Sequence, residues 1–190
     1  MDPFATLGIN PVFDVDLARL EKTHRELSRA LHPDKFVGTG ASERRIALTK
    51  AVEVNEAWRI VRDPIRRAEA LFARANIPVG ETNEPKPSGA FLMDMMEQRE
   101  ALVEAKAARD LDAIKALELE IRTRARDAES ALATGFATEE KDEAKKSVAL
   151  ASLVVKLGEL RFYRRFLEEV SMAEDDLANA SLNGLRHDAP

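Results

Sequence analysis

His32, Pro33 and Asp34 stand side by side and bring together an imidazole and a carboxylate, two groups that often serve as general acid and base. No nucleophile or third polar group is evident nearby to complete a catalytic set. Neighbouring side chains on a turn usually point apart, and either group could simply satisfy backbone groups at a helix end. The pattern therefore disfavours an enzyme, and it leaves open why a loop carries these three residues.

The segments on both sides of the tripeptide are predicted to be helices. We expect Asp14 to cap the first helix and Pro33 to end it, because proline lacks a backbone donor and clashes with the preceding turn. Its apolar residues share one face: Leu17, Leu20, Leu27 and Leu31. After a short loop at 37–41, Ser42 is expected to cap a second helix that packs against the first. Asp63 and Pro64 should cap and open a third, shorter helix.

A basic strip is predicted on the first helix, away from the leucines, and leads to the loop. It consists of Lys22, Arg25 and Arg29, and Lys35 lies just past the loop. On charge alone this could be an ordinary solvated face, because Glu21 and Glu26 are interleaved. A basic helix that runs into a His-Pro-Asp loop between two antiparallel helices, here with the sequence "LHPDKF", resembles the J-domain.

The resemblance implies a co-chaperone that docks on a DnaK-type chaperone and accelerates its ATP hydrolysis, without hydrolysing ATP itself. By match, the chaperone-binding residues would be Lys22, Arg25, Arg29, His32, Pro33, Asp34 and Lys35. The Asp34 carboxylate could form a charge-assisted bond to a partner arginine, and Pro33 would limit the freedom of the loop before binding. Leu31 stands where many J-domains carry tyrosine, which should alter packing more than docking.

Composition excludes several classes of function. The 190 residues carry 29 Lys and Arg against 34 Asp and Glu, a net charge of −5, which disfavours a nucleic-acid or membrane-surface protein. The absence of cysteine excludes disulfides and thiolate metal sites, and three scattered histidines make a metal site improbable, so no cofactor is expected. No segment approaches the roughly 20 apolar residues that span a bilayer. We expect a cytoplasmic protein.

The rest of the chain also reads as helical, and the predicted fold class is all-α. Asn76 to Gly89 has the Pro- and Gly-rich composition of a connector, and three helices should follow as a bundle: Ala90 to about Arg109, about Leu111 to Thr134 before Gly135, and Glu139 to about Ser171 capped by Thr138. The expected organisation is a J-domain at 1–76, an antiparallel hairpin with flanking short helices, a linker at 77–89, a three-helix bundle at 90–172 and a disordered tail at 173–190.

Three further stretches narrow the resemblance. "VNEAWRIVRDPIRRAEAL", "SGAFLMDMMEQREALVEA" and "ELRFYRRFLEEV" occur in the order found in HscB, the J-domain co-chaperone of iron–sulfur cluster assembly. The resemblance implies that the bundle binds an IscU-type scaffold and presents it to an HscA-type chaperone. Because this chain has no cysteine, any cluster would belong to the scaffold. The alternative is a J-domain co-chaperone for a different client, with the bundle as a general adaptor or dimerisation module; a monomer or a weak dimer fits either function.

The scaffold contacts that this resemblance implies lie on two bundle helices. They are Leu92, Met93, Met96, Glu97, Glu100 and Glu104 on the first, and Phe162 on the last. By their spacing, five of these residues form one stripe that is apolar at its start and acidic further along: Met93, Met96, Glu97, Glu100 and Glu104. Apolar residues at helical spacing are usually core, so the sequence leaves open whether Leu92, Met93 and Met96 are exposed or buried. Glu97, Glu100 and Glu104 could equally be a solvated face.

Overall fold

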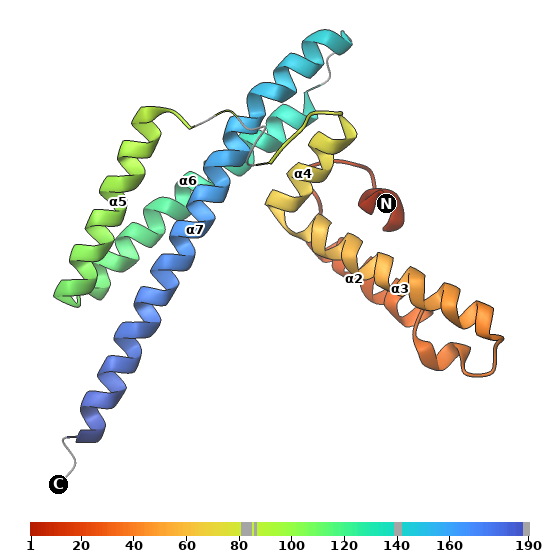
Figure 1. The fold of residues 1–190 in the computed structure, drawn as a ribbon, viewed down its shortest axis with the longest axis horizontal. Helices are drawn as coiled ribbons and strands as arrows, with labels where there is room; N and C mark the ends of the chain where they lie inside the picture. Colours follow the sequence, from red (N-terminus) through yellow and green to blue (C-terminus); the bar gives the residue numbers. More distant parts are fainter. Residues whose placement is uncertain (81–84, 86, 139–141, 188–190) are drawn as a thin grey trace. The chain divides into compact units, whose positions relative to one another are not determined.

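The computed structural model describes residues 1–80, 85, 87–138 and 142–187, with side chains except at 143, 144 and 180–187. Every regular element in these ranges is helical, which confirms the all-α prediction (Figure 1). The elements are α1 (Pro3–Thr6), α2 (Leu17–Ala30), the 3-10 helix η1 (Pro33–Phe36), α3 (Ala41–Arg62), α4 (Pro64–Arg74), α5 (Gly89–Ala108), α6 (Leu111–Ala137) and α7 (Glu143–His187).

The chain forms two compact units. The first consists of Met1–Asn83 and Leu132–Ser152, and the second of Glu84–Ala131 and Leu153–Pro190. From the sequence, the whole of 90–172 was expected to be one bundle. Instead, the ends of α6 and α7 around residues 132–152 belong with the N-terminal helices.

In the first unit α2 and α3 form the expected antiparallel hairpin, and α3 also contacts α1, α4 and η1 (Figure 1). Two expected caps are wrong. The carboxylate of Asp16, not of Asp14, accepts a hydrogen bond from the Arg19 N–H (2.9 Å), and Gly40 precedes α3 in place of Ser42. The predicted cap of α4 is confirmed, since Asp63 Oδ1 accepts from the Arg66 N–H at 3.0 Å.

An aromatic cluster explains why the tip of α6 packs in the first unit. The ring of Phe136 lies 6.0 Å from Phe13 and 4.9 Å from Phe72, centroid to centroid. Phe13 and Phe72 are buried, and the guanidinium of buried Arg67 lies 4.7 Å above the Phe13 ring. The sequence predicted that α6 would end before Gly135, but the helix continues to Ala137 because Phe136 is held in this cluster.

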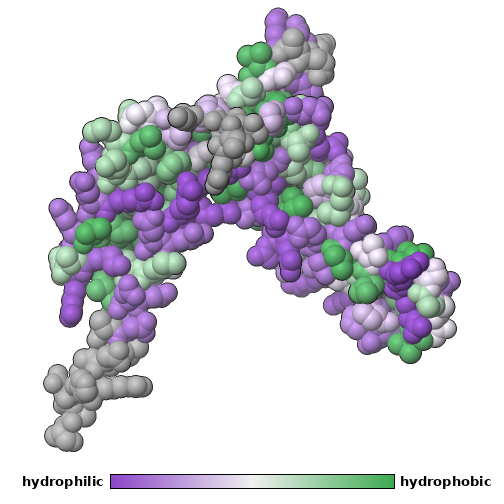
Figure 2. Space-filling model, in the orientation of Figure 1, coloured by the Kyte–Doolittle hydropathy of each residue, from purple (hydrophilic) through white to green (hydrophobic). Residues whose placement is uncertain are grey.

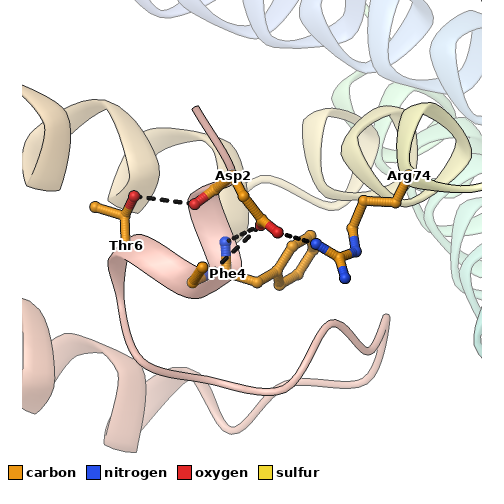
Figure 3. Close-up of polar contacts among 5 residues, drawn as sticks. Asp2, Phe4, Thr6 and Arg74 are labelled. Atoms are coloured by element: carbon orange, nitrogen blue, oxygen red, sulfur yellow. Dashed lines mark hydrogen bonds and ion pairs between the residues drawn. The ribbon is translucent and has the colours of Figure 1, made fainter.

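The N-terminus is tied into the same unit by Asp2 (Figure 3). Its Oδ1 accepts the Phe4 N–H at 3.0 Å and caps α1, while its backbone carbonyl accepts the Thr6 hydroxyl at 2.9 Å. The other carboxylate oxygen pairs with Arg74 near the end of α4. Asp2 therefore fixes α1 against α4, and Phe4 is fully buried beside it.

The second unit is a helical bundle in which α5 and α7 run parallel. Two ion pairs connect these helices, Arg99–Glu169 (2.8 Å) and Lys106–Asp176 (3.4 Å). Both partners advance by seven residues from one pair to the next, as in parallel helices. The expected start of the last helix at Glu139 lies outside the described residues; α7 begins at Glu143. A disordered tail was expected from Ala173, but α7 continues to His187. At the start of this segment, Ala173 is buried and Asp176 pairs with Lys106, so the helix still packs against the bundle there.

Candidate protein-docking sites

The first candidate site is the loop between α2 and α3. Leu31 ends α2, and His32 caps η1: its Nδ1 accepts the Asp34 N–H at 3.3 Å, and the Lys35 N–H donates to the His32 carbonyl at 3.0 Å. The Asp34 side chain is 85% exposed, and its Oδ2 lies 3.4 Å from His32 Nδ1. These two contacts, one from the His32 side chain and one between backbone groups, hold the loop in a tight turn, and the Asp34 carboxylate points into solvent.

The predicted basic strip is exposed along its whole length. Lys22, Arg25, Arg29 and Lys35 are all exposed, as are His32 and Pro33. Arg25 pairs with Glu21 one turn earlier on α2. Within the described part of the chain, the side chains of Lys22, Arg29 and Lys35 make no hydrogen bond or ion pair. An exposed i,i+4 pair contributes little to stability, so the strip adds almost nothing to the fold.

A set of contacts between α2 and α3 fixes the helix that carries the strip. The His24 imidazole stacks on Trp58 with 4.9 Å between ring centroids, and its Nε2 lies 2.9 Å from Asn55 Oδ1. Ser28 Oγ lies 3.3 Å from the same nitrogen. These contacts were not predicted from the sequence. The one local signal was the spacing of His24 and Ser28, which lie one helical turn apart and can therefore hydrogen-bond. The contacts set the register of α2, and with it the direction of the basic strip.

The second candidate site is the outward face of α5, where Figure 2 shows apolar side chains gathered over the N-terminal half of the helix. Ser88 Oγ accepts the Phe91 N–H at 3.1 Å and starts this helix. The open question of exposure has a clear answer: Leu92, Met93 and Met96 are 39%, 63% and 61% exposed. The adjacent Met95 is 3% exposed and provides the core contact instead.

Phe162 of α7 lies beside the start of α5. Its ring makes an edge contact with Phe91 at 5.5 Å, and the Arg165 guanidinium lies 4.6 Å over its face. Phe91 also contacts buried Tyr163, with 5.8 Å between ring centroids. The structure thus brings Phe162 to the turn of α5 that carries Leu92, and Phe91 is an aromatic support that the sequence reasoning missed.

A partly exposed ion network holds α5 against α6. Arg124 of α6 pairs with Asp94 of α5, and with Glu120 one turn earlier at 2.6 Å. Burial lowers the pKa of Arg124, but hydrogen bonds and charge from Asp94 and Glu120 outweigh that effect and leave its pKa above the ordinary value. The guanidinium stays charged, and it keeps the inner side of α5 anchored while the outer side faces solvent.

The acidic residues of the α5 face have no such partners. Glu97, Glu100 and Glu104 are exposed, and no ion pair of theirs occurs among residues 1–80, 85, 87–138 and 142–187. Three like charges at steps of three and four repel one another slightly on a helix. The second site therefore combines exposed apolar side chains with an uncompensated negative edge, a pattern suited to a partner surface that is apolar and basic.

Tyr163 offers a spectroscopic probe of this bundle because it is the single tyrosine of the chain. Burial, and then the charge of Glu159, raises the pKa of its phenol. The folded state therefore holds the proton more tightly than the unfolded state, so this contribution to stability is complete below about pH 10 and is lost as pH rises further. We expect tyrosinate absorbance to appear at higher pH in folded than in denatured protein. The alkaline loss of stability should be smaller in Tyr163→Phe; equal titration in both states would contradict it.

Among the residues that the structure describes, no group of three or more His, Asp or Glu side chains could hold a metal ion. Within the same ranges, no helix is long and apolar enough to cross a membrane.

Comparison with known proteins identifies the family and the fold. Residues 88–171 match the family described as the HSCB C-terminal oligomerisation domain. In structure, the chain is similar to the chaperone HscB from Vibrio cholerae, with a TM-score of 0.77 and 28% identity over 93% of this chain and 99% of that one. It also shares the fold of human co-chaperone protein HscB, at 22% identity and a TM-score of 0.77, over 92% of this chain and 82% of that one.

Relatives in sequence extend over both units. A co-chaperone protein HscB homolog of Mannheimia succiniciproducens is 32% identical over 179 residues, which cover 94% of this chain and 98% of the relative. The homolog of Neisseria meningitidis is 35% identical over 154 residues, 81% of this chain and 93% of the relative. Identity at this level over nearly the whole relative means that the chain belongs to the HscB family of co-chaperone proteins.

Proposed function

We propose that this HscB-family co-chaperone acts in iron–sulfur cluster assembly in the cytoplasm. It binds an IscU-type scaffold through the outward face of α5 and delivers the scaffold to an HscA/DnaK-type chaperone. Through the His-Pro-Asp loop it stimulates ATP hydrolysis by that chaperone. The hydrolytic chemistry is the chaperone's, and the cluster is cargo of the scaffold. The chain itself works as an adaptor, as a monomer or a weak dimer.

The observation that carries the proposal is the exposed Asp34 carboxylate at the end of the basic helix α2. An 85% exposed carboxylate on a loop held by hydrogen bonds to His32 can bond a partner guanidinium with little ordering cost. The side chains of Lys22, Arg29 and Lys35 form no hydrogen bond or ion pair within the described residues. They can therefore bind an acidic surface of the chaperone. Charges of this kind raise the rate of association and fix the orientation of docking.

The proposal that the chain binds the scaffold is based on the outward face of α5. Leu92, Met93 and Met96 expose apolar area that the free protein does not bury, and thioether side chains adapt readily to a partner surface. The negative edge at Glu97, Glu100 and Glu104 supplies orientation towards basic groups. Phe162 supports the apolar part from α7. Because both sites are on one chain, bound scaffold is presented to the docked chaperone at a raised effective concentration.

The alternative is a co-chaperone for a different client, with the bundle as a general adaptor or a dimerisation module. It predicts the same chaperone docking but no dependence on an IscU-type scaffold. Steady-state phosphate release by the chaperone separates the two. We expect stimulation by the chain alone and a further increase when scaffold is added. Stimulation that scaffold leaves unchanged would favour the alternative, and the absence of any stimulation would overturn both.

The same assay tests the basic strip. Arg25→Glu with Arg29→Glu should weaken docking on the chaperone by about tenfold or more, because attraction becomes repulsion at two positions. Docking of the wild-type chain should weaken with added salt, since exposed charges are screened. A matched control is Arg44→Glu with Arg45→Glu, which makes the same change in net charge on exposed residues of α3. Equal loss in both variants would show that only net charge matters.

A further inference from the structure

The apolar part of the α5 face extends beyond the three residues singled out by the sequence. Val103 is 66% exposed, more than Met96 at 61%. Leu92, Met96 and Val103 follow one another at steps of four and seven, which return to nearly the same side of a helix. They form a ridge about 16 Å long, at 1.5 Å per residue. Arg99 and Glu100 occupy the turn between Met96 and Val103, so the ridge is apolar at both ends, and the acidic residues lie along one edge of it.

The two edges of this ridge differ in their pairing. On one edge lie Glu97, Glu100 and Glu104, which have no ion-pair partner among the described residues. On the other edge, Arg99 donates from Nε and Nη2 to Glu169 at 3.2 and 2.8 Å, and Lys106 pairs with Asp176 at 3.4 Å. Positive charge on that edge is already neutralised by α7. Only the glutamate edge still offers charge to a partner.

Fold stability gives no reason for valine at this position. Val103 is one of the β-branched residues, which have lower helix propensity than alanine, and its side chain is largely in solvent, where packing is small. By contrast, its neighbours Leu102 and Ala105 are 4% and 6% exposed and supply the core contacts of this turn. An exposed valine in line with Leu92 and Met96 is instead what a longer apolar contact needs.

We propose that Val103 is a further contact residue for the scaffold and that the ridge of Leu92, Met96 and Val103 is the axis of docking. The occupant is the IscU-type scaffold, which should present an apolar strip flanked by lysine or arginine on one side only, the side that meets Glu100 and Glu104. This inference rests on the proposed function and extends it to the partner's chemistry. Its support is the exposure of Leu92, Met96 and Val103 on one side of α5 and the one-sided charge.

The test is a calorimetric titration of the full chain with purified IscU-type scaffold. Val103→Ala should weaken binding about five- to tenfold, as loss of a moderate interface contact does. Alanine favours the helix, so the melting temperature should not fall. Leu119→Ala is the matched control, because Leu119 is 64% exposed on α6 of the same unit. It should bind like the wild type.

The charge asymmetry has its own pair of variants. Glu104→Gln should weaken binding and reduce its salt dependence, whereas Lys106→Gln on the paired edge should change neither. If Val103→Ala binds normally while alanine at Leu92, Met93 and Met96 abolishes binding, the extension is overturned and the proposed function stands. If neither weakens binding, the proposed scaffold site itself fails. If Val103→Ala instead lowers only self-association, measured by sedimentation, a second copy covers the ridge and the inference is overturned.

Discussion

Replacing Asp34 with Asn is expected to remove most of the stimulation of the partner ATPase while leaving the fold intact. Truncating one member of a docked charge pair costs roughly 2 kcal/mol or more, about thirtyfold in affinity. In the free protein the carboxylate loses only an exposed contact to His32 at 3.4 Å, which is worth little. Phosphate release under steady-state conditions gives the first quantity, and a thermal melt gives the second.

Glu53→Gln is the matched control for this variant. Glu53 is an exposed residue of α3 in the same unit, and the change to an amide removes one negative charge just as Asp34→Asn does. The control should stimulate the ATPase like the wild type. A well-folded Asp34→Asn chain that still stimulates the ATPase fully would contradict the assignment of the loop as the chaperone contact. This conclusion would not depend on whether the bundle binds the scaffold.

Local signals in the sequence predicted the helices where a single residue decides the matter. Pro33 had to end α2, and Asp63 with Pro64 had to open α4, since these effects depend on backbone chemistry alone. Asp14 and Asp16 could not be separated in this way, because both are good caps and only the packing of Leu20 selects the register. Local sequence was enough to predict that a helix forms here, but the first residue of the helix depends on how it packs in the core.

Contacts between distant parts of the chain account for the larger differences. Glycine often ends a helix, so Gly135 was expected to end α6. Phe136 packs against Phe13 and Phe72, however, and α6 continues past Gly135. No short window of sequence contains that information. The helical extension of α7 past Ala173 is similar, because the ion pair of Asp176 with Lys106 joins residues 70 positions apart. The division of α6 and α7 between two units follows from the same long-range packing.

For the docking sites, the sequence indicated candidate residues but not which of them were exposed. Met95 and Met96 are identical in chemistry and adjacent in position, yet one is 3% and the other 61% exposed. The choice depends on where α6 and α7 lie around α5. The spacing of Leu92, Met96 and Val103 places them on one side of a helix, but spacing alone does not tell an exposed side from a buried one. Exposure in the folded unit is what brings Val103 into the site.

Alanine at Leu92, Met93 and Met96 together is expected to weaken capture of the scaffold at least about a hundredfold. Interface anchors are typically worth about 1–3 kcal/mol each, and tenfold in affinity corresponds to about 1.4 kcal/mol. The free energy of unfolding should change much less, because these side chains are 39%, 63% and 61% exposed and alanine is the better helix former. A scaffold titration and a thermal melt on the same preparation measure both quantities.

Met95→Ala is the complementary test of the proposal that the outward face of α5 binds the scaffold. It truncates a methionine, as Met96→Ala does, but at the neighbouring buried position. At 3% exposure Met95 lies in the core of the bundle, so its truncation should cost about 2–5 kcal/mol of folding free energy and leave the affinity of the folded fraction nearly unchanged. Met96→Ala should do the reverse. If Met96→Ala lowered the melting temperature as much as Met95→Ala and left scaffold affinity intact, the outward face of α5 would be structural. The delivery of scaffold would then have to depend on another surface of the chain.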